Sequence, residues 1–240
     1  MAALDTVLTR AIRSWAGARG LQAWQKAIHH DTASPDLFVG TGPCFLHVGC
    51  GPARSPDVAP GLRGAQWHEI RLDIDPWVHP DIVASIVDMP TVPTGCVDAV
   101  YSSHNLEHLS PHEVPLALAE FRRVLKPDGV LIVTCPDLQA VARLIADDKL
   151  CEVAYESAEG PISPIDILYG HRPALAEGRM TMAHRTGFTL RSLSEAVQQA
   201  GFATLAGRAR PSHLDLWVAA SCAPLSQAQA QAMADLHLPA

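Results

Sequence analysis

Short apolar segments alternate along this chain with longer segments whose apolar residues recur at helical spacing. Apolar runs of roughly four to eight residues bounded by glycine, proline or polar residues are typical of buried strands. Their alternation with helices predicts an α/β fold, with a mostly parallel sheet covered by helices on both faces. The predicted strands are residues 45–48, 69–72, 82–84, 99–102 and 130–134, followed by 202–205 and 215–219 as a closing antiparallel pair.

Two helices carry clear sequence signals. The first is predicted over residues 111–125, with Ser110 as N-cap, Pro111 at the first helical position and Glu113 completing a capping box. The second is predicted over residues 190–200 and stops at the glycine that follows. Between the first and second strands, by contrast, prolines and glycines predict an irregular loop or one short turn in place of a full helix.

A glycine turn, Gly49-Cys50-Gly51, follows the first predicted strand directly. Glycines let the backbone approach a ligand closely and take up conformations that a side chain would forbid. The dinucleotide fingerprint requires a third glycine, but Arg54 stands there, which argues against a pyrophosphate. Asp73, about 20 positions downstream, is placed to hold ribose hydroxyls. The pattern therefore favours a ribose-containing cofactor without a pyrophosphate.

Five segments in order strengthen this interpretation: 48–52 (VGCGP), 72–76 (LDIDP), 87–90 (VDMP), 97–109 (VDAVYSSHNLEHL) and 120–131 (EFRRVLKPDGVL). In sequence and spacing they resemble the motifs of class I S-adenosylmethionine (SAM) dependent methyltransferases, in particular the methyltransferase type 11 group. The resemblance covers about residues 44–133. It implies a Rossmann-like, three-layer αβα fold with a terminal antiparallel strand, SAM as cofactor, and methyl transfer as the activity.

The resemblance also implies roles for individual residues. Asp73 is expected to bind the ribose and Asp88 the adenine amino group, while Gly49 and Gly51 lie under the methionine end of SAM. The full set of expected cofactor-binding residues is Val48, Gly49, Cys50, Gly51, Asp73, Ile74, Asp88, Met89, Ser103 and His104.

Two histidines after the fourth strand are the candidate catalytic residues. His104 stands at the carboxyl end of that strand, where an imidazole of ordinary pKa, about 6.5, can accept a proton from the acceptor. His108 is the second candidate, with a packed histidine that orients the loop as its alternative. Residues 104–108 also match the zinc-protease pattern H-x-x-E-H, but that pattern needs a sustained helix and a further ligand. No metal site is predicted.

Residues 151–188 lose the alternating pattern and are rich in proline, glycine, histidine and arginine. Loops beyond the fifth strand lie above the carboxyl ends of the strands, so this insertion is a candidate lid or substrate wall. A surface excursion or a homodimer contact is the equal alternative. The expected substrate-binding residues are Tyr169, His171, Arg172, His184 and Arg185.

Composition narrows the class of partner. A net charge of −7 and a pI near 5.9 argue against nucleic acid as substrate, which requires a basic face. The six cysteines show no C-x-x-C spacing, so they predict neither zinc nor disulfides, are interpreted as structural, and suit a cytoplasmic location. No apolar run approaches the roughly 20 residues that span a membrane. The basic, amphipathic N-terminus resembles a transit peptide, but we favour a helix that caps the core.

These observations predict four segments: an N-terminal helical extension (1–36), the SAM-binding core (37–150), the insertion (151–188) and the closing helix and strands (189–240). The expected function is transfer of a methyl group from SAM to a small-molecule or glycan acceptor by in-line displacement. Two alternatives remain: a SAM-binding regulatory or scaffold protein without turnover, and an NAD-dependent oxidoreductase.

Overall fold

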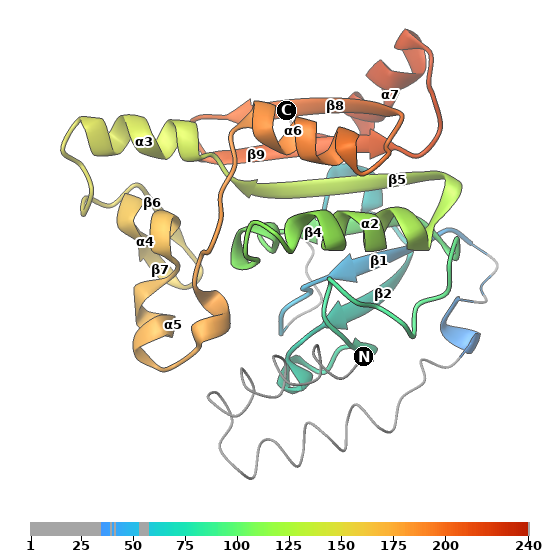
Figure 1. Ribbon diagram of the computed structural model, residues 1–240, viewed down its shortest axis with the longest axis horizontal. Helices are drawn as coiled ribbons and strands as arrows, with labels where there is room; N and C mark the ends of the chain where they lie inside the picture. Colours follow the sequence, from blue (N-terminus) through green and yellow to red (C-terminus); the bar gives the residue numbers. More distant parts are fainter. Residues whose placement is uncertain (1–34, 39, 41, 53–57, 240) are drawn as a thin grey trace.

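The computed structural model describes residues 35–38, 40, 42–52 and 58–239, so nearly all of the predicted N-terminal extension lies outside the described residues. A seven-stranded sheet, in the order β3-β2-β1-β4-β5-β9-β8, forms its centre (Figure 1). The first five strands in this order are parallel, while β9 is antiparallel to both β5 and β8. The strands are β1 (Cys44–Val48), β2 (His68–Asp73), β3 (Ile82–Val83), β4 (Val97–Ser103), β5 (Leu125–Pro136), β8 (Thr204–Arg210) and β9 (Asp215–Ser221).

The predicted Rossmann-like fold and its closing antiparallel pair are therefore confirmed. Chain order reverses at β1, which pairs with β2 on one side and with β4 on the other. In open α/β sheets this reversal opens a crevice beyond the carboxyl ends of the strands, where ligands bind. The topology thus fixes where a cofactor site can form.

Helices cover both faces of the sheet. On one face, α2 (Val114–Val124) and α6 (Leu190–Gln199) bury a cluster that includes Leu46, Phe121 and Leu193. On the other face, α7 (Gln227–His237) and the short 3-10 helix η2 (Pro60–Leu62) pack over residues such as Phe45 and Ile132. The sequence analysis did not predict α7, because its repeated Gln-Ala pairs lack a strong apolar stripe.

The helix predicted to begin at Pro111 begins instead at Val114. Ser110 and Glu113 still make the expected contact, since the Glu113 carboxylate accepts the Ser110 backbone N–H at 2.7 Å, but they do so in a turn before the helix. Pro115 explains the shift, because in a helix starting at Pro111 its ring would clash with the carbonyl four residues earlier. At this position it lies in the first turn, where a proline is tolerated.

Three further 3-10 helices lie before the insertion: η1 (Pro35–Phe38), η3 (Pro76–Val78) and η4 (Leu106–His108). The predicted absence of a full helix after β1 concerns residues 53–57 in part, and these lie outside the described residues. The described parts of that connection, residues 49–52 and 58–67, contain the short 3-10 helix η2 and no α-helix.

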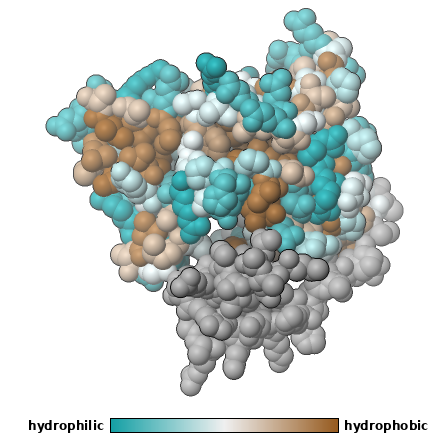
Figure 2. Space-filling model, viewed as in Figure 1, coloured by the Kyte–Doolittle hydropathy of each residue, from teal (hydrophilic) through white to brown (hydrophobic). Residues whose placement is uncertain are grey.

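The insertion has regular structure of its own. It contains the hairpin β6 (Tyr155–Ser157) and β7 (Gly160–Ile162), then α4 (Pro164–Tyr169), α5 (Arg172–Ala176) and the 3-10 helix η5 (Met180–Met182). Its apolar residues Ile162 and Ile167 pack with Val141 of α3 (Leu138–Ala146) in a small separate cluster. Figure 2 shows apolar surface over this region, where Val153 is exposed. Within the described residues, no helix has both the length and the apolar character needed to cross a membrane.

Candidate functional site

Three chain segments meet at the carboxyl edge of the sheet, on either side of the order reversal. The glycine turn follows β1, Asp73 ends β2, and Ser103 ends β4 beside His104. These residues are separated by up to about half the core sequence, yet the parallel pairing of β1 with both neighbours places them at one crevice. The structure therefore brings together the main predicted cofactor-binding residues.

The glycine turn has one supported side and one bare side. Gly49 and Gly51 have φ values of 58° and 67°, in the left-handed region that favours glycine. A Cβ atom on Gly49 would lie 1.8 Å from Oδ1 of Asn105, whereas a Cβ on Gly51 would meet no atom of the described chain within 4 Å. Asn105 Nδ2 also donates to the Val48 carbonyl at 2.8 Å. Asn105 thus supports the turn at Gly49, while the space beside the Gly51 Cα stays open.

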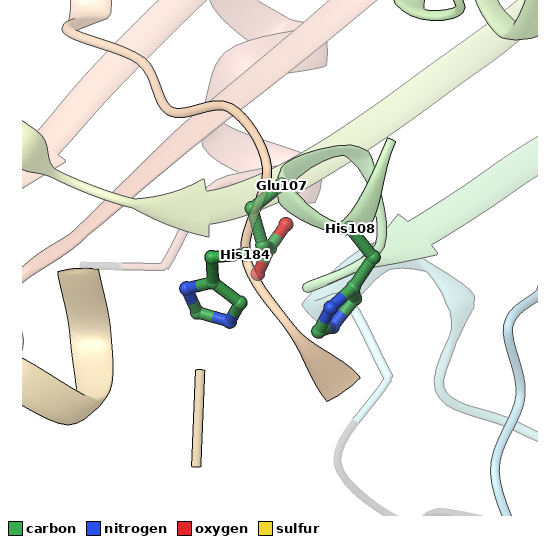
Figure 3. Close-up of side chains that lie close together, drawn as sticks. All are labelled: Glu107, His108 and His184. Carbon is green, nitrogen blue, oxygen red and sulfur yellow. The ribbon is translucent and has the colours of Figure 1, made fainter. Parts of the chain in front are cut away.

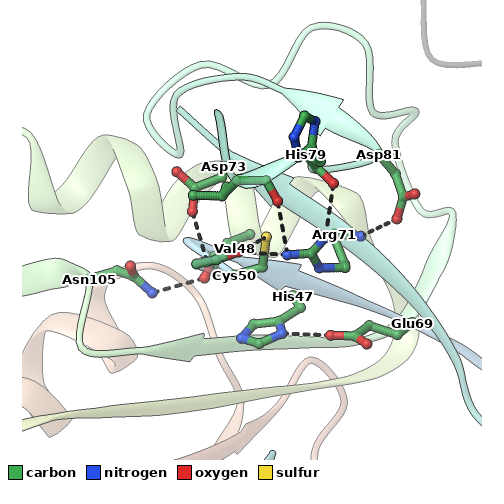
Figure 4. A network of polar contacts seen from close by, with 11 residues as sticks. His47, Val48, Cys50, Glu69, Arg71, Asp73, His79, Asp81 and Asn105 are labelled. Carbon is green, nitrogen blue, oxygen red and sulfur yellow. Dashed lines mark hydrogen bonds and ion pairs between the residues drawn. The ribbon is translucent and has the colours of Figure 1, made fainter. Parts of the chain in front are cut away.

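Asp73 lies directly against this turn (Figure 4). Its Oδ2 accepts the Gly51 N–H at 3.0 Å, and its Oδ1 accepts the Asp75 N–H at 2.9 Å. The two bonds orient the carboxylate between the ends of β1 and β2. Ile74, the next expected cofactor contact, is 39% exposed beside it, as a surface available to a ligand requires.

Arg71, which the sequence analysis missed, also holds the glycine turn in place. Its side chain is buried, and its Nη2 donates to the Gly51 carbonyl at 2.6 Å while its Nη1 donates to the His79 carbonyl at 2.9 Å. Its backbone N–H donates to Asp81 at 2.8 Å. β2 reads HEIRLD, in which charged and apolar residues alternate, so its sequence carries no signal that Arg71 is buried, although buried cations are rare unless they have partners.

The loop expected to contact adenine divides into an exposed and a buried residue. Asp88 is exposed, and its N–H donates to the Ser85 carbonyl at 3.1 Å. Met89 differs from the prediction: its side chain is fully buried in the core, its N–H donates to Glu120 and its carbonyl accepts from Arg123. Met89 therefore anchors the loop from within, while Asp88 presents a carboxylate to solvent.

His104 forms a dyad with Glu107. Its Nδ1 lies 3.2 Å from Oε1 of Glu107, and its side chain is 47% exposed, whereas that of Glu107 is 2% exposed. Burial alone would lower the pKa of His104, but the Glu107 carboxylate outweighs this and the pKa is raised. Burial would raise the pKa of Glu107, yet the imidazoles of His104 and His108 lower it. His104 also has a positive φ of 54°, a strained conformation that often marks functional residues.

His108 and His184 lie beside Glu107 (Figure 3). Their ring centroids are 4.9 Å apart, and the rings are inclined by 70°. His108 Nδ1 lies 3.2 Å from the Ala183 carbonyl, and His184 Nδ1 lies 2.7 Å from the Ile167 carbonyl. Burial lowers the pKa of His184. The contact of His108 with the insertion agrees with the interpretation of a packed histidine that orients this loop.

The other expected substrate-binding residues lie in two groups. Arg185, which is exposed, follows His184, and its N–H donates to the Glu107 carbonyl at 2.7 Å. Arg172 instead pairs with the buried Asp166 at 2.6 Å. His171 precedes it at the start of α5, and Tyr169, at the end of α4, is 60% exposed. The structure thus brings His184 and Arg185 to the crevice edge and gives Arg172 a structural partner within the insertion.

The candidate cysteines have the character of core residues. Burial, followed by the nearby Asp73 charge, raises the pKa of Cys50 to about 12. Burial also raises the pKa of Cys135 well above its ordinary value, and its side chain is fully buried. Neither thiol is therefore activated as a nucleophile, since the thiolate is the reactive form.

Comparison with known proteins assigns the central part of the chain. Residues 46–133 match the family model described as a methyltransferase domain, type 11. This match runs from Leu46 in β1 to Val133 in β5, and so includes the glycine turn, Asp73, Asp88 and the His104–Glu107 dyad. No curated protein matches the chain in sequence.

The chain is also similar to solved structures. The citrinin polyketide synthase CMeT domain aligns with a TM-score of 0.51 at 12% identity, covering 77% of this chain and 47% of that one. An O-methyltransferase family protein from Burkholderia thailandensis gives 0.49 at 11% identity, covering 81% and 55%, and the CurJ carbon methyltransferase gives 0.46 at 12%, covering 76% and 49%. The chain spans about half the length of each of these three proteins.

Proposed function

We propose that this enzyme, whose residues 46–133 match the model of a methyltransferase domain, methylates a small-molecule or glycan acceptor by in-line displacement. One observation carries the proposal: the glycine turn, the Asp73 carboxylate and the His104–Glu107 dyad meet at the crevice where the strand order reverses. SAM is the cofactor of this class of enzyme and supplies an electrophilic methyl group.

The residues at the crevice fit such a cofactor. The bare side of the turn at Gly51, where a Cβ would meet open space, leaves room for a ligand to approach the backbone. Asp73 is held at the end of β2 with a carboxylate that can accept hydroxyl hydrogens, and we assign it to the ribose. We assign the exposed Asp88 to the adenine amino group and Ile74 to the adenine face.

We assign the role of general base to His104. Its Nδ1 faces Glu107, so the Glu107 carboxylate orients the imidazole, whose side chain is 47% exposed. A carboxylate behind an imidazole stabilises the protonated ring, which assists removal of a proton from an incoming hydroxyl or amine. His104 is therefore the proposed proton acceptor, and Glu107 is a positioning residue.

The acceptor class follows from charge and shape. A net charge of −7 supplies no general electrostatic attraction for nucleic acid. The insertion contributes His184 and the exposed Arg185 next to Glu107, which suits a polar or anionic small molecule rather than an apolar one. We propose that the insertion forms the acceptor wall.

The first test is calorimetric binding of SAM, S-adenosylhomocysteine and NAD to the purified protein. We expect micromolar binding of the two sulfur nucleosides and at least about tenfold weaker binding in Asp73→Asn, since loss of a charged hydrogen bond is worth about 1.5–3 kcal/mol. Asp128→Asn, a change of the same kind at an exposed residue near the start of β5, is the matched control and should bind normally.

These binding measurements, together with an assay of methyl transfer, separate the alternative functions. Preference for NAD would contradict the cofactor assignment and favour an oxidoreductase. Normal SAM binding without labelled methyl transfer to any member of a broad set of hydroxyl, amine and glycan acceptors would instead favour a SAM-binding regulatory protein. Transfer that is lost in His104→Gln, with SAM affinity unchanged, would support the assignment of His104 as base.

A further inference from the structure

A second polar cluster adjoins the His104–Glu107 dyad. Glu107, His108 and His184 each offer one ligand atom, and these atoms lie within 4.8 Å of one another. Figure 3 shows the Glu107 carboxylate between the two imidazoles. Glu107 and His108 come from η4, whereas His184 comes from the end of the insertion. Folding therefore assembles a set of two imidazoles and one carboxylate from distant parts of the sequence.

The tautomer of each imidazole follows from its contacts. In both His108 and His184, Nδ1 faces a backbone carbonyl, at 3.2 Å and 2.7 Å respectively. A carbonyl oxygen only accepts hydrogen bonds, so Nδ1 carries the hydrogen and Nε2 of the neutral ring carries a lone pair. Histidines that bind metals are held in this way, with the second ring nitrogen donating to a carbonyl or carboxylate.

Glu107 lacks a partner on the same side. Its Oε1 is taken by His104, but its Oε2 is buried and has no hydrogen-bond partner among the described residues. The residue is 1% exposed. A buried carboxylate oxygen without a partner is energetically unfavourable. Two neutral imidazoles that present lone pairs cannot satisfy it, so the three atoms repel one another unless a cation lies between them.

We propose that Glu107, His108 and His184 form a binding site for one divalent transition-metal ion, with Zn²⁺ as the expected occupant. Two imidazoles and a carboxylate suit Zn²⁺ and its neighbours, whereas Mg²⁺ and Ca²⁺ prefer oxygen ligands alone. Each ligand atom would lie about 2.0–2.2 Å from the ion, so binding requires the three side chains to move closer together. His104 would stay outside the ligand set and orient Glu107.

Three protein ligands leave at least one coordination position open, which is the arrangement of catalytic rather than structural zinc sites. The site lies beside the proposed acceptor wall, because the Glu107 carbonyl accepts the N–H groups of Arg185 and Thr186. The open position would take an oxygen or nitrogen atom of the acceptor, and this step rests on the proposed function. Zn²⁺ binding itself does not depend on the cofactor assignment.

The test is titration of metal-free protein with Zn²⁺ in competition with a chromophoric chelator, in the absence of SAM. We expect one equivalent to bind, and we expect His184→Gln and Glu107→Gln to weaken binding by at least about 10- to 100-fold. His112→Gln removes an exposed imidazole from a nearby turn and should leave the affinity unchanged. Mg²⁺ should not compete.

Failure of wild-type protein to bind Zn²⁺, or unchanged affinity in His184→Gln, would overturn the proposal. His184 is partly exposed, so this variant decides the matter even if Glu107→Gln does not fold. Replacing Zn²⁺ by Co²⁺ tests the open position: acetohydroxamate should change the visible spectrum of the Co²⁺ protein, and an unchanged spectrum would refute that part. SAM binding, measured separately, distinguishes failure of the metal site from failure of the cofactor site.

Discussion

Arg71 ties the glycine turn to the loop after β2, and its replacement tests whether this contact stabilises the proposed cofactor site. In Arg71→Met, the hydrogen bonds to the Gly51 carbonyl (2.6 Å) and the His79 carbonyl (2.9 Å) are lost. Each bond from a charged donor contributes about 1.5 kcal/mol at the lower end of its range, or about 3 kcal/mol together. Arg71 Nε, however, is buried without a hydrogen-bond partner among the described residues, and its removal returns about 1 kcal/mol.

The net expectation for Arg71→Met is a loss of about 2 kcal/mol in the free energy of unfolding, or about 4–8 °C in Tm for a chain of this size. Arg71→Lys retains the charge and one donor, so it should lose about half as much. Urea denaturation followed by tryptophan fluorescence measures the change, with the exposed Arg143→Met as the matched control. A loss below about 0.5 kcal/mol in Arg71→Met, or equal losses in Met and Lys, would refute the reasoning.

Three further predictions follow from the same structure. Gly49→Ala should unfold the turn and abolish SAM binding, because its Cβ would overlap Asn105 at 1.8 Å. Gly51→Ala should fold with a loss of about 1 kcal/mol in stability and should only weaken SAM binding. Circular dichroism measures the stability and calorimetry the SAM affinity, and equal stability losses in the two variants would contradict this contrast. Phe121→Ala, at a fully buried core position of α2, should lose about 3–5 kcal/mol of stability in urea denaturation, while the exposed Leu116→Ala should lose much less. Burial raises the pKa of Asp166, but Arg172 and Ser163 outweigh burial and hold that pKa well below its ordinary value. The stability that Asp166 contributes is therefore complete above its unfolded pKa of about 3.9 and is lost as the pH falls below that value. Wild type should lose stability more steeply under acid than Asp166→Asn, and the exposed Asp147→Asn should behave as wild type.

The parallel core was predictable from sequence because most of its strands are short apolar runs, and such a run only has to pair with its neighbours in the sheet. The five parallel strands and the closing pair were all located, but several ends were displaced: β5 begins at Leu125 rather than at residue 130, and β8 runs from Thr204 to Arg210 rather than over 202–205. The start of α2 was wrong because the capping signal at Ser110 was weighed without the steric effect of Pro115. A local pattern of this kind predicts a contact correctly and still misplaces the helix that follows.

The site residues that sequence reasoning missed act through long-range contacts. Asn105 was part of the recognised segment after β4, but its role appears only when its side chain is seen beneath Gly49. Arg71 lies in a strand that alternates charged and apolar residues, and no local pattern indicates that it holds a carbonyl 20 residues earlier. The expected contact of Met89 differed for the same reason, since its burial depends on Glu120 and Arg123 of α2.

The insertion and the His104–Glu107 dyad are joined by both backbone and side-chain contacts. The Glu107 carbonyl accepts two N–H groups of the insertion, and the His108 ring contacts both Ala183 and His184. Any movement of residues 183–186 must therefore change the position of Glu107, and through it the orientation of His104. An acceptor that contacts the insertion would in this way adjust the proposed base at the same time as it fills the site. Variation in the insertion should accordingly alter turnover as well as acceptor affinity, because the two share Glu107.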